Sequence, residues 1–137
     1  MDIKHLSKIM VEFYERLSSW EDSVVRDSGL TTAQAHTIEI VGHAGPIKMK
    51  DLAQKIGVTT GTLTVAVDRL EEKNLLVRKP HKKDRRAYLI DLTEAGHAYF
   101  NQHHNFHIRM TQEVVAGLTD EEQEAFAKIL ETILKHI

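Results

Sequence analysis

Apolar residues recur along most of the chain at the spacing of an amphipathic α-helix. Between residues 3 and 26 they fall at steps of three and four, which predicts a first long helix with one apolar face. The same spacing runs from residue 94 to about 116, and it returns after Thr119 to Glu122, which has the form of a capping box. Only two prolines and seven glycines interrupt these patterns. The chain is therefore expected to be mainly helical.

The middle of the chain has the pattern of a helix-turn-helix. A helix is expected to begin at a cap near Thr31 and to stop at the break that starts with Gly42. A short helix over residues 49–56 ends at Gly57, and the helix over residues 59–70 follows at once. Small hydroxyl side chains near the start of that second helix suit contacts with phosphates and base edges in a DNA major groove. These side chains belong to Thr59, Thr60, Thr62 and Thr64.

Two short apolar runs enclose the most basic stretch of the chain. The runs are Leu75–Val77 and Tyr88–Leu92, and both have the length and composition of strands. Residues 78–86 between them hold six Lys or Arg and one Asp, a formal charge of +5 in a chain whose total is −2. A two-stranded wing with such a turn suits a phosphate backbone. The wing residues assigned to the DNA contact are Lys82, Lys83, Asp84, Arg85 and Arg86.

The predicted elements make one mainly α domain over residues 1–137, with a small two-stranded β-wing. Residues from about 30 to 95 form the winged helix-turn-helix lobe, and residues 1–27 and 96–137 hold the remaining helices. A lobe of about 70 residues can cover only part of the apolar faces of those helices. A second copy of the chain is their expected partner, in a symmetric dimer. Two recognition helices could then meet the two half-sites of a pseudo-palindromic operator in double-stranded DNA.

Composition excludes several classes of protein. The absence of cysteine rules out disulfides, thiolate metal sites and a cysteine nucleophile. No run approaches the roughly 18 apolar residues of a membrane span, and the N-terminal residues lack a signal-peptide pattern, so we expect a soluble, cytoplasmic protein without a membrane partner. A glycine-rich phosphate loop, a nucleophile motif and His-Glu-x-x-His are all absent. The chain is not expected to be an enzyme.

Three segments carry a resemblance to a known family. They are the turn Leu52-Ala53-x-x-Ile56-Gly57-Val58, the segment Arg69-Leu70-Glu71-x-x-Asn74-Leu75-Leu76, and the wing pattern Asp84-x-Arg86 followed by Leu92-Thr93. Together with the order of elements, they make the chain resemble the MarR family of bacterial winged-helix regulators over essentially its whole length.

The resemblance implies a homodimeric transcription repressor. In such a protein the helix from about Thr60 would lie in the major groove, and Arg86 of the wing would reach the minor groove. Asp84 would pair with a nearby arginine and so hold the wing. The physical chemistry agrees, because a narrow A·T-rich minor groove concentrates negative potential and favours an inserted arginine.

Histidines are the side chains that suggest a signal. His103 and His107 are four residues apart on a predicted helix, so both rings project from one face. With His36 and Glu21 they would make a nitrogen and oxygen site suited to zinc. The same four residues resemble the ligands of the zinc-responsive branch of the family. Ala35 and Gln102 stand where that branch has carboxylates of a second site.

A second branch offers a different signal for the same histidines. Four segments, residues 36–42, 58–64, 84–86 and 103–110, resemble the fatty-acid-synthesis repressors of the family, which respond to acyl chains on acyl carrier protein. The expected effector is therefore an acyl chain or another apolar ligand, with zinc as the alternative; the histidines could also merely hydrogen-bond one another and the first helix. The residues expected to line the effector pocket are Phe13, Leu17, Trp20, His36, Ile40, Phe100, His103, Phe106, His107 and Met110.

Overall fold

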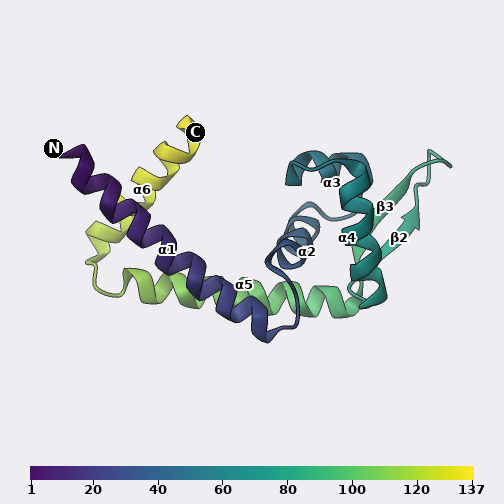
Figure 1. The fold of residues 1–137 in the computed structure, drawn as a ribbon, viewed down its shortest axis with the longest axis horizontal. Helices are drawn as coiled ribbons and strands as arrows, with labels where there is room; N and C mark the ends of the chain where they lie inside the picture. The colour runs from purple at the N-terminus through teal and green to yellow at the C-terminus, as the bar shows by residue number, and fades with distance from the viewer. The chain divides into compact units, whose positions relative to one another are not determined.

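The computed structural model describes all of residues 1–137 as six helices and three short strands (Figure 1). In chain order the elements are α1 (Ile3–Asp27), α2 (Thr32–Ala44), β1 (Ile47–Lys48), α3 (Met49–Ile56), α4 (Thr60–Glu72), β2 (Leu76–Pro80), β3 (Tyr88–Leu92), α5 (Glu94–Val115) and α6 (Asp120–His136). The expected mainly helical fold is confirmed. The chain forms two compact units, Met1–Phe100 and Asn101–Ile137, so α5 begins in the first unit and continues into the second.

The sheet of the first unit has one strand more than the sequence indicates. The order is β1-β3-β2, and both pairs are antiparallel. The predicted wing pair is confirmed, with a register that runs from Leu76 opposite Leu92 to Pro80 opposite Tyr88. The added strand, β1, is only two residues long and pairs Ile47 with Ile90. Two residues are too few to show an alternating pattern, which is why the sequence predicts only two strands.

The core of the first unit lies between the helix-turn-helix and the sheet. The fully buried side chains come from the end of α1, from α2, α3 and α4, and from the middle of β3. Burying each of them stabilises the fold by about 1.5–3 kcal/mol relative to exposure. They are Val25, Ile38, Val41, Leu52, Leu63, Val67, Leu70 and Ile90. Leu63, Val67 and Leu70 fix the inward face of α4, so its opposite face is open to solvent.

The start of α5 is docked on the turn between α4 and β2. Asn74 adopts a left-handed conformation in that turn, with φ of 59°. The Thr93 hydroxyl donates to the carbonyl of Asn74 at 2.6 Å and accepts the N–H of Gly96 at 3.0 Å, while the Thr93 N–H donates to the carbonyl of Leu75 at 3.1 Å. A Cβ at Gly96 would lie 2.1 Å from the Leu75 carbonyl oxygen. Only glycine permits this close approach.

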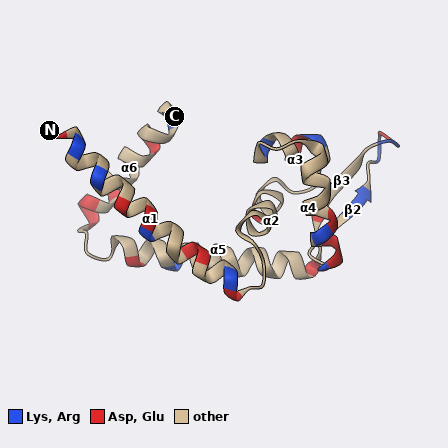
Figure 2. Ribbon diagram, in the orientation of Figure 1, with Lys and Arg blue, Asp and Glu red and all other residues tan.

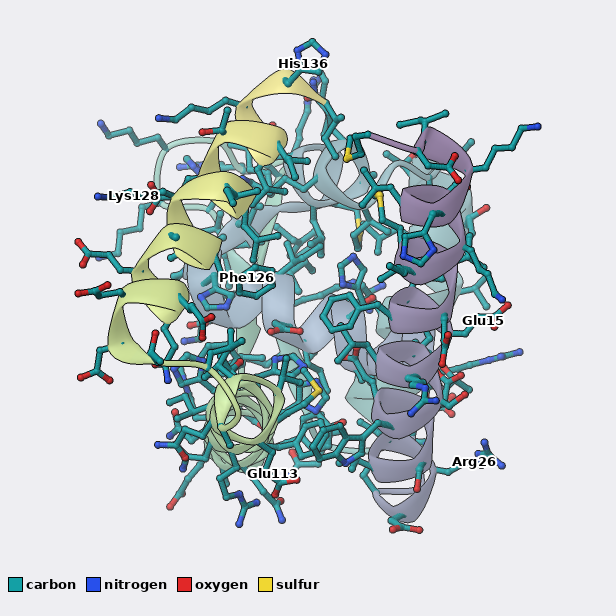
Figure 3. The ribbon with its side chains drawn as sticks, turned by 90° about the vertical axis from the view of Figure 1, so that its left-hand side faces the viewer. Glu15, Arg26, Glu113, Phe126, Lys128 and His136 are labelled. Carbon is teal, nitrogen blue, oxygen red and sulfur yellow. The ribbon has the colours of Figure 1, made fainter.

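The second unit is the remainder of α5 and the whole of α6. The predicted capping box at the start of α6 is confirmed: the Thr119 hydroxyl accepts the N–H of Glu122 at 3.2 Å, and the Glu122 carboxylate accepts the N–H of Thr119 at 2.8 Å. Phe126 and Lys128 extend from opposite sides of α6, as a helical period requires (Figure 3). No residue of α6 is buried in the single chain. None of the six helices has both the length and the apolar character needed to cross a membrane.

Candidate nucleic-acid interface

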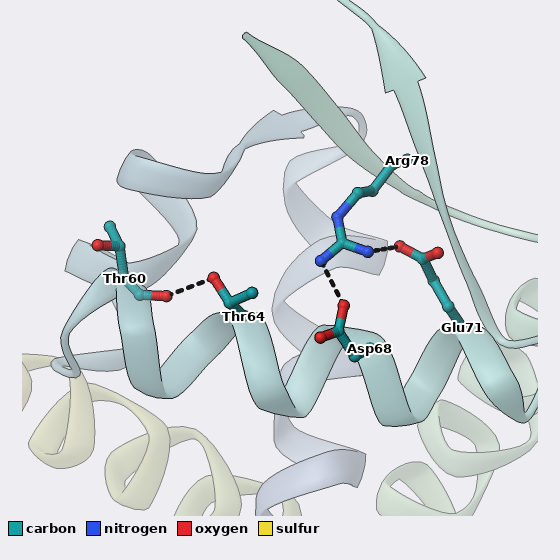
Figure 4. Close-up of polar contacts among 5 residues, drawn as sticks. All are labelled: Thr60, Thr64, Asp68, Glu71 and Arg78. Carbon is teal, nitrogen blue, oxygen red and sulfur yellow. Dashed lines mark hydrogen bonds and ion pairs between the residues drawn. The ribbon is translucent and has the colours of Figure 1, made fainter.

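Some of the hydroxyl groups at the start of the recognition helix α4 form hydrogen bonds with the backbone of that helix. Thr59 is the N-cap, and its hydroxyl oxygen accepts the N–H of Thr62 at 3.2 Å. The Thr59 hydroxyl in turn donates to the Thr62 hydroxyl at 3.0 Å, and the Thr64 hydroxyl donates to the carbonyl of Thr60 at 2.7 Å (Figure 4). All four predicted threonines are exposed. Thr62 therefore keeps a proton to donate to DNA, whereas Thr64 keeps only its acceptor lone pairs.

Val65 extends this surface and is missed by the polar pattern of the sequence. It lies on the outer face of α4 and is 52% exposed, although it is a large apolar residue. The inward spacing of Leu63, Val67 and Leu70 places it outward, and this spacing is the signal that could have identified it. An exposed valine in a recognition helix suits contact with a thymine methyl group.

Arg78 ties the wing to the recognition helix. From β2 its guanidinium reaches Asp68 of α4, with Nη2 to Oδ1 at 2.7 Å, and it also forms an ion pair with Glu71 of α4 (Figure 4). The hydrogen bond that Arg78 donates to Asp68 and the charges of both carboxylates raise the pKa of Arg78 against the opposing effect of burial. The base of the wing therefore holds a fixed position against the helix that precedes it. The sequence counts Arg78 as one more cation of the wing, but two carboxylates neutralise it.

The remaining wing charges are concentrated beyond β2. Lys79 pairs with Asp91 across the two strands at 3.0 Å, so carboxylates balance the charges of both Arg78 and Lys79. Figure 2 shows the blue of Lys and Arg along the outer wing and on α3. Four exposed cations follow in the loop between β2 and β3, and these are Lys82, Lys83, Arg85 and Arg86.

Asp84 organises the loop through the backbone. Its carboxylate accepts the N–H of Arg86 at 3.1 Å, and its carbonyl accepts the N–H of Ala87 at 3.1 Å. The resemblance implied that Asp84 pairs with an arginine side chain, whereas the hydrogen bond in the structure is with the arginine backbone. This leaves the guanidinium of Arg86 to extend from the turn while its main chain is held.

An open groove of about 460 Å³ joins the recognition helix to the wing. Thr64 and Arg86, which the sequence assigns to DNA from separate elements, both line it. Two further lysines line it, Lys48 at the end of β1 and Lys50 in the first turn of α3. Neither is among the residues that the sequence assigns to DNA, although two lysines so close to the helix-turn-helix are themselves a signal for phosphate contact. The full lining is Lys48, Met49, Lys50, Thr64, Arg78, Asp84, Arg86, Ala87 and Tyr88.

The effector and metal candidates of the first unit differ in exposure. Glu21, Leu17, Trp20 and Ile40 are half-buried, whereas Phe13 is exposed. His36 is exposed on α2. Another candidate, Phe100, packs edge-on against His43 with ring centroids 5.1 Å apart and covers Gly42, where a Cβ would lie 2.3 Å from the Phe100 ring.

The candidates of the second unit form a small aromatic cluster on α5. His103 and Phe106 are buried, with 6% and 8% of their surfaces exposed, and His107 is half-buried. The His103 and His107 rings lie 4.4 Å apart between centroids, and the Phe106 ring is 6.0 Å from the first and 5.7 Å from the second. The predicted projection of both imidazoles from one face of the helix is confirmed. Met110, one turn further on, is half-buried.

Comparisons with known proteins agree with the geometry. A model of the MarR family matches residues 30–88, which span the helix-turn-helix and most of the wing. The transcriptional regulator MhqR of Bacillus subtilis is 26% identical over 125 residues, which cover 91% of this chain and 86% of that protein. The crystal structure of Streptococcus pneumoniae FabT in complex with DNA superposes with a TM-score of 0.90 at 23% identity, covering 98% of this chain and 96% of that one.

A third comparison extends to a regulator from a different bacterium. The apo form of MarR from E. coli is 26% identical, superposes with a TM-score of 0.74 and covers 98% of both chains. The FabT likeness bears on the fold alone, but the sequence relatives are transcriptional regulators and match through the same helix-turn-helix and wing. Because these elements bring their basic and hydroxyl side chains to one surface, and a curated regulator matches over 91% of the chain, residues 30–88 form the winged helix-turn-helix of a MarR-type transcriptional regulator.

Proposed function

We propose that this protein is a homodimeric transcriptional repressor that binds a pseudo-palindromic DNA operator and releases it in response to an effector. The observation that carries the proposal is the groove lined by Thr64 of α4, by Arg86 of the wing, by Lys48 of β1 and by Lys50 of α3. It is a cationic channel between a recognition helix and a wing, and DNA is the ligand such a channel suits.

Each part of this surface has a distinct role in the proposal. The exposed start of α4, with Thr60, Thr62 and Val65, enters the major groove and reads base edges. Arg86 reaches the minor groove from the wing, whose base is held by the Arg78 ion pairs. The lysines lining the groove contact the phosphate backbone between the two points of insertion, and Lys82, Lys83 and Arg85 add phosphate contacts from the loop.

The dimer is proposed from apolar surface that the single chain leaves exposed. On α1 this surface includes Ile9, Met10 and Phe13, which are 48%, 57% and 41% exposed. On α6 it includes Ile129 and Ile133, at 57% and 41%. A second copy that buries these side chains would gain about 1.5–3 kcal/mol for each one fully covered. The lobe of about residues 30–95 would then bind DNA, and the outer helices would hold the two lobes together.

The dimer can be tested without DNA. Ile133→Asp places a charge on the exposed apolar face of α6 and should shift the protein toward monomers in sedimentation equilibrium, because burying an unpaired carboxylate is costly. Lys128→Ala, on the polar side of the same helix, is the matched control. A variant that stays dimeric at the wild-type dissociation constant would argue against α6 as part of the interface.

The effector is proposed to be an acyl chain or another apolar ligand. Support comes from α5, where the buried Phe106 ring lies beside the rings of His103 and His107. Aromatic side chains are typical of sites for apolar ligands. Zinc is the alternative, favoured by the 4.4 Å separation of the His103 and His107 rings on α5.

The two effectors predict different results in a DNA-binding assay. An acyl effector requires that long-chain acyl carrier protein changes operator affinity and that zinc and chelators do not. A zinc effector requires that zinc and chelators change operator affinity and that long-chain acyl carrier protein does not. The effect of zinc should then be lost in a His103→Ala, His107→Ala variant. Either signal would act by binding one arrangement of the protein more tightly than the other.

DNA binding itself is tested by selecting operator sequences from random DNA and measuring their affinity by fluorescence anisotropy. Arg86→Ala should weaken binding and make log affinity fall less steeply with log salt, by up to about 0.9 for the lost contact. Arg16→Ala on α1 serves as a control, because Arg16 pairs with Glu12 far from the wing in sequence. Unchanged binding by Arg86→Ala would refute the role of the wing.

A further inference from the structure

His81 occupies the first position after β2 and accepts two hydrogen bonds with a single atom. Its Nδ1 lies 3.1 Å from the backbone N of Lys83 and 3.0 Å from the backbone N of Asp84, and both N–H groups donate to it. An imidazole nitrogen can accept a hydrogen bond only while it carries no proton. The loop geometry therefore requires a His81 ring with Nδ1 unprotonated, which in the neutral form places the proton on Nε2.

The wing loop has few other bonds that fix its shape. The N–H of His81 donates to the Ala87 carbonyl at 3.1 Å and closes the loop. Asp84 supplies the rest, through its carbonyl to Ala87 and its carboxylate to Arg86. Two side-chain acceptors, His81 and Asp84, thus organise the segment that carries the four exposed cations. Of these two side chains, the imidazole is the one in which a bound proton replaces the acceptor with a donor at the same atom.

We propose that His81 is a positioning residue for DNA binding and that protonation of its Nδ1 weakens binding by releasing the wing loop. Protonation turns Nδ1 into a donor that faces two other donors, so both hydrogen bonds are lost and the two N–H groups repel the new proton. The cations of the loop then sample many positions and must be ordered again on DNA. The inference rests on the proposed DNA-binding function.

The positive charge that protonation adds to His81 has an effect of its own on DNA affinity. An imidazolium beside a phosphate backbone adds a positive charge, which by itself would strengthen DNA binding as pH falls. Loss of loop order weakens DNA binding as pH falls. The direction in which affinity changes with pH therefore distinguishes the effect of the added charge from the effect of lost loop order. The titratable and charged residues that flank His81 along the wing are Lys79, already paired with Asp91, then Lys82, Lys83, Asp84, Arg85 and Arg86 of the loop, and Tyr88 of β3.

Two substitutions distinguish the role of the hydrogen-bond acceptor at position 81 from the effect of protonating the histidine ring. His81→Asn keeps a side-chain oxygen that can accept backbone N–H groups two and three residues ahead, as asparagine does in turns, and it does not titrate. His81→Ala removes the acceptor altogether. At pH 8 we expect His81→Asn to bind operator DNA within about threefold of wild type, and His81→Ala to bind roughly three- to tenfold more weakly, as the loss of one or two hydrogen bonds implies.

The decisive comparison is the same titration repeated near pH 5.5. Wild-type affinity should fall toward that of His81→Ala, whereas the affinity of His81→Asn relative to its own pH 8 value should change less. The control is His97→Asn on α5, which removes an exposed histidine elsewhere and should keep the wild-type pH dependence. Equal pH dependence in wild type and His81→Asn, or affinity that rises in wild type alone, would overturn the proposal.

A measurement without DNA keeps the inference separate from the function. Nitrogen-15 spectra of the free protein at pH 8 should show the His81 proton on Nε2, and the amides of Lys83 and Asp84 should lose protection from exchange as His81 is protonated. A proton on Nδ1 at pH 8 would refute the inference even if DNA binding is intact. Conversely, if Arg86→Ala leaves DNA binding unchanged while these spectra are as expected, the proposed role of the wing fails and the loop geometry stands.

Discussion

Replacing Gly96 with alanine should destabilise this protein by about 3 kcal/mol, although alanine is the better helix former. The new Cβ would lie 2.1 Å from the carbonyl oxygen of Leu75, which is backbone and cannot rotate away. To restore ordinary contact, the start of α5 and the turn after α4 must separate by more than 1 Å, a shift that follows from the usual contact distance of about 3.5 Å.

The magnitude follows from what that separation breaks. It strains two hydrogen bonds, from the Thr93 N–H to Leu75 and from the Thr93 hydroxyl to Asn74, each worth about 0.5–1.5 kcal/mol. Overpacking adds about 1–3 kcal/mol, and the better helix propensity of alanine returns about 1 kcal/mol. The middle of these ranges leaves a net loss of about 3 kcal/mol, equivalent to a fall in melting temperature of roughly 10 °C for a chain of this length.

The assay is urea denaturation followed by circular dichroism at one fixed protomer concentration, because dimerisation adds to apparent stability. Gly61→Ala is the matched control: it also lies in the first turn of a helix, but its added Cβ would meet nothing closer than 4.0 Å. That variant should be as stable as wild type or up to about 1 kcal/mol more stable. If Gly96→Ala unfolds at the wild-type urea midpoint, the close approach of α5 to the α4–β2 turn is not as described.

Three further substitutions test other parts of the molecule. Arg78→Ala should weaken operator binding by roughly three- to tenfold in anisotropy titrations, since the wing loses its link to α4 and two carboxylates lose their neutralising partner; wild-type affinity would show that the ion pairs do not position the wing. The double variant Lys48→Ala, Lys50→Ala should reduce the slope of log affinity against log salt by up to about 1.8, and Lys55→Ala at the far end of α3 should not. Burial raises the pKa of Tyr99, so the folded state disfavours the phenolate, and stability present below the unfolded pKa of about 10 should be lost as pH rises above it. Tyr99→Phe should lessen this alkaline loss in urea midpoints measured between pH 9 and 11, and an unchanged loss would assign it to other groups.

The sequence predicts the helices well because their signals are local. The period of Leu63, Val67 and Leu70 sets the inward face of α4, and the capping box at Thr119 and Glu122 marks the start of α6 within four residues. The strand pair of the wing is also predicted, since each strand contains apolar residues beside a basic segment. Each of these features can be recognised without knowing which residues meet across the fold.

The parts that the sequence does not predict are pairings between distant positions. Arg78 counts toward the positive charge of residues 78–86, and only the placement of β2 against α4 shows that Asp68 and Glu71 neutralise it. Lys48 belongs to the interface only because β1 adds to the sheet beside β3. From the sequence, the Asp84 carboxylate could accept a hydrogen bond from either an arginine guanidinium or a backbone N–H. Only the conformation of the loop shows that the backbone N–H of Arg86 is the donor.

The neutralisation of Arg78 and Lys79 at the base of the wing has a kinetic consequence. With the inner cations paired, the unpaired positive charge of the wing is confined to its outer loop. Long-range attraction depends on such unpaired charge, so loop cations should govern the rate of association and its sensitivity to salt. The side chains of α4 act only after contact and should govern the lifetime of the complex. Substitutions in the loop and in α4 could therefore lower the equilibrium affinity equally by different routes. A loop substitution would lower the association rate constant, whereas a substitution in α4 would raise the dissociation rate constant.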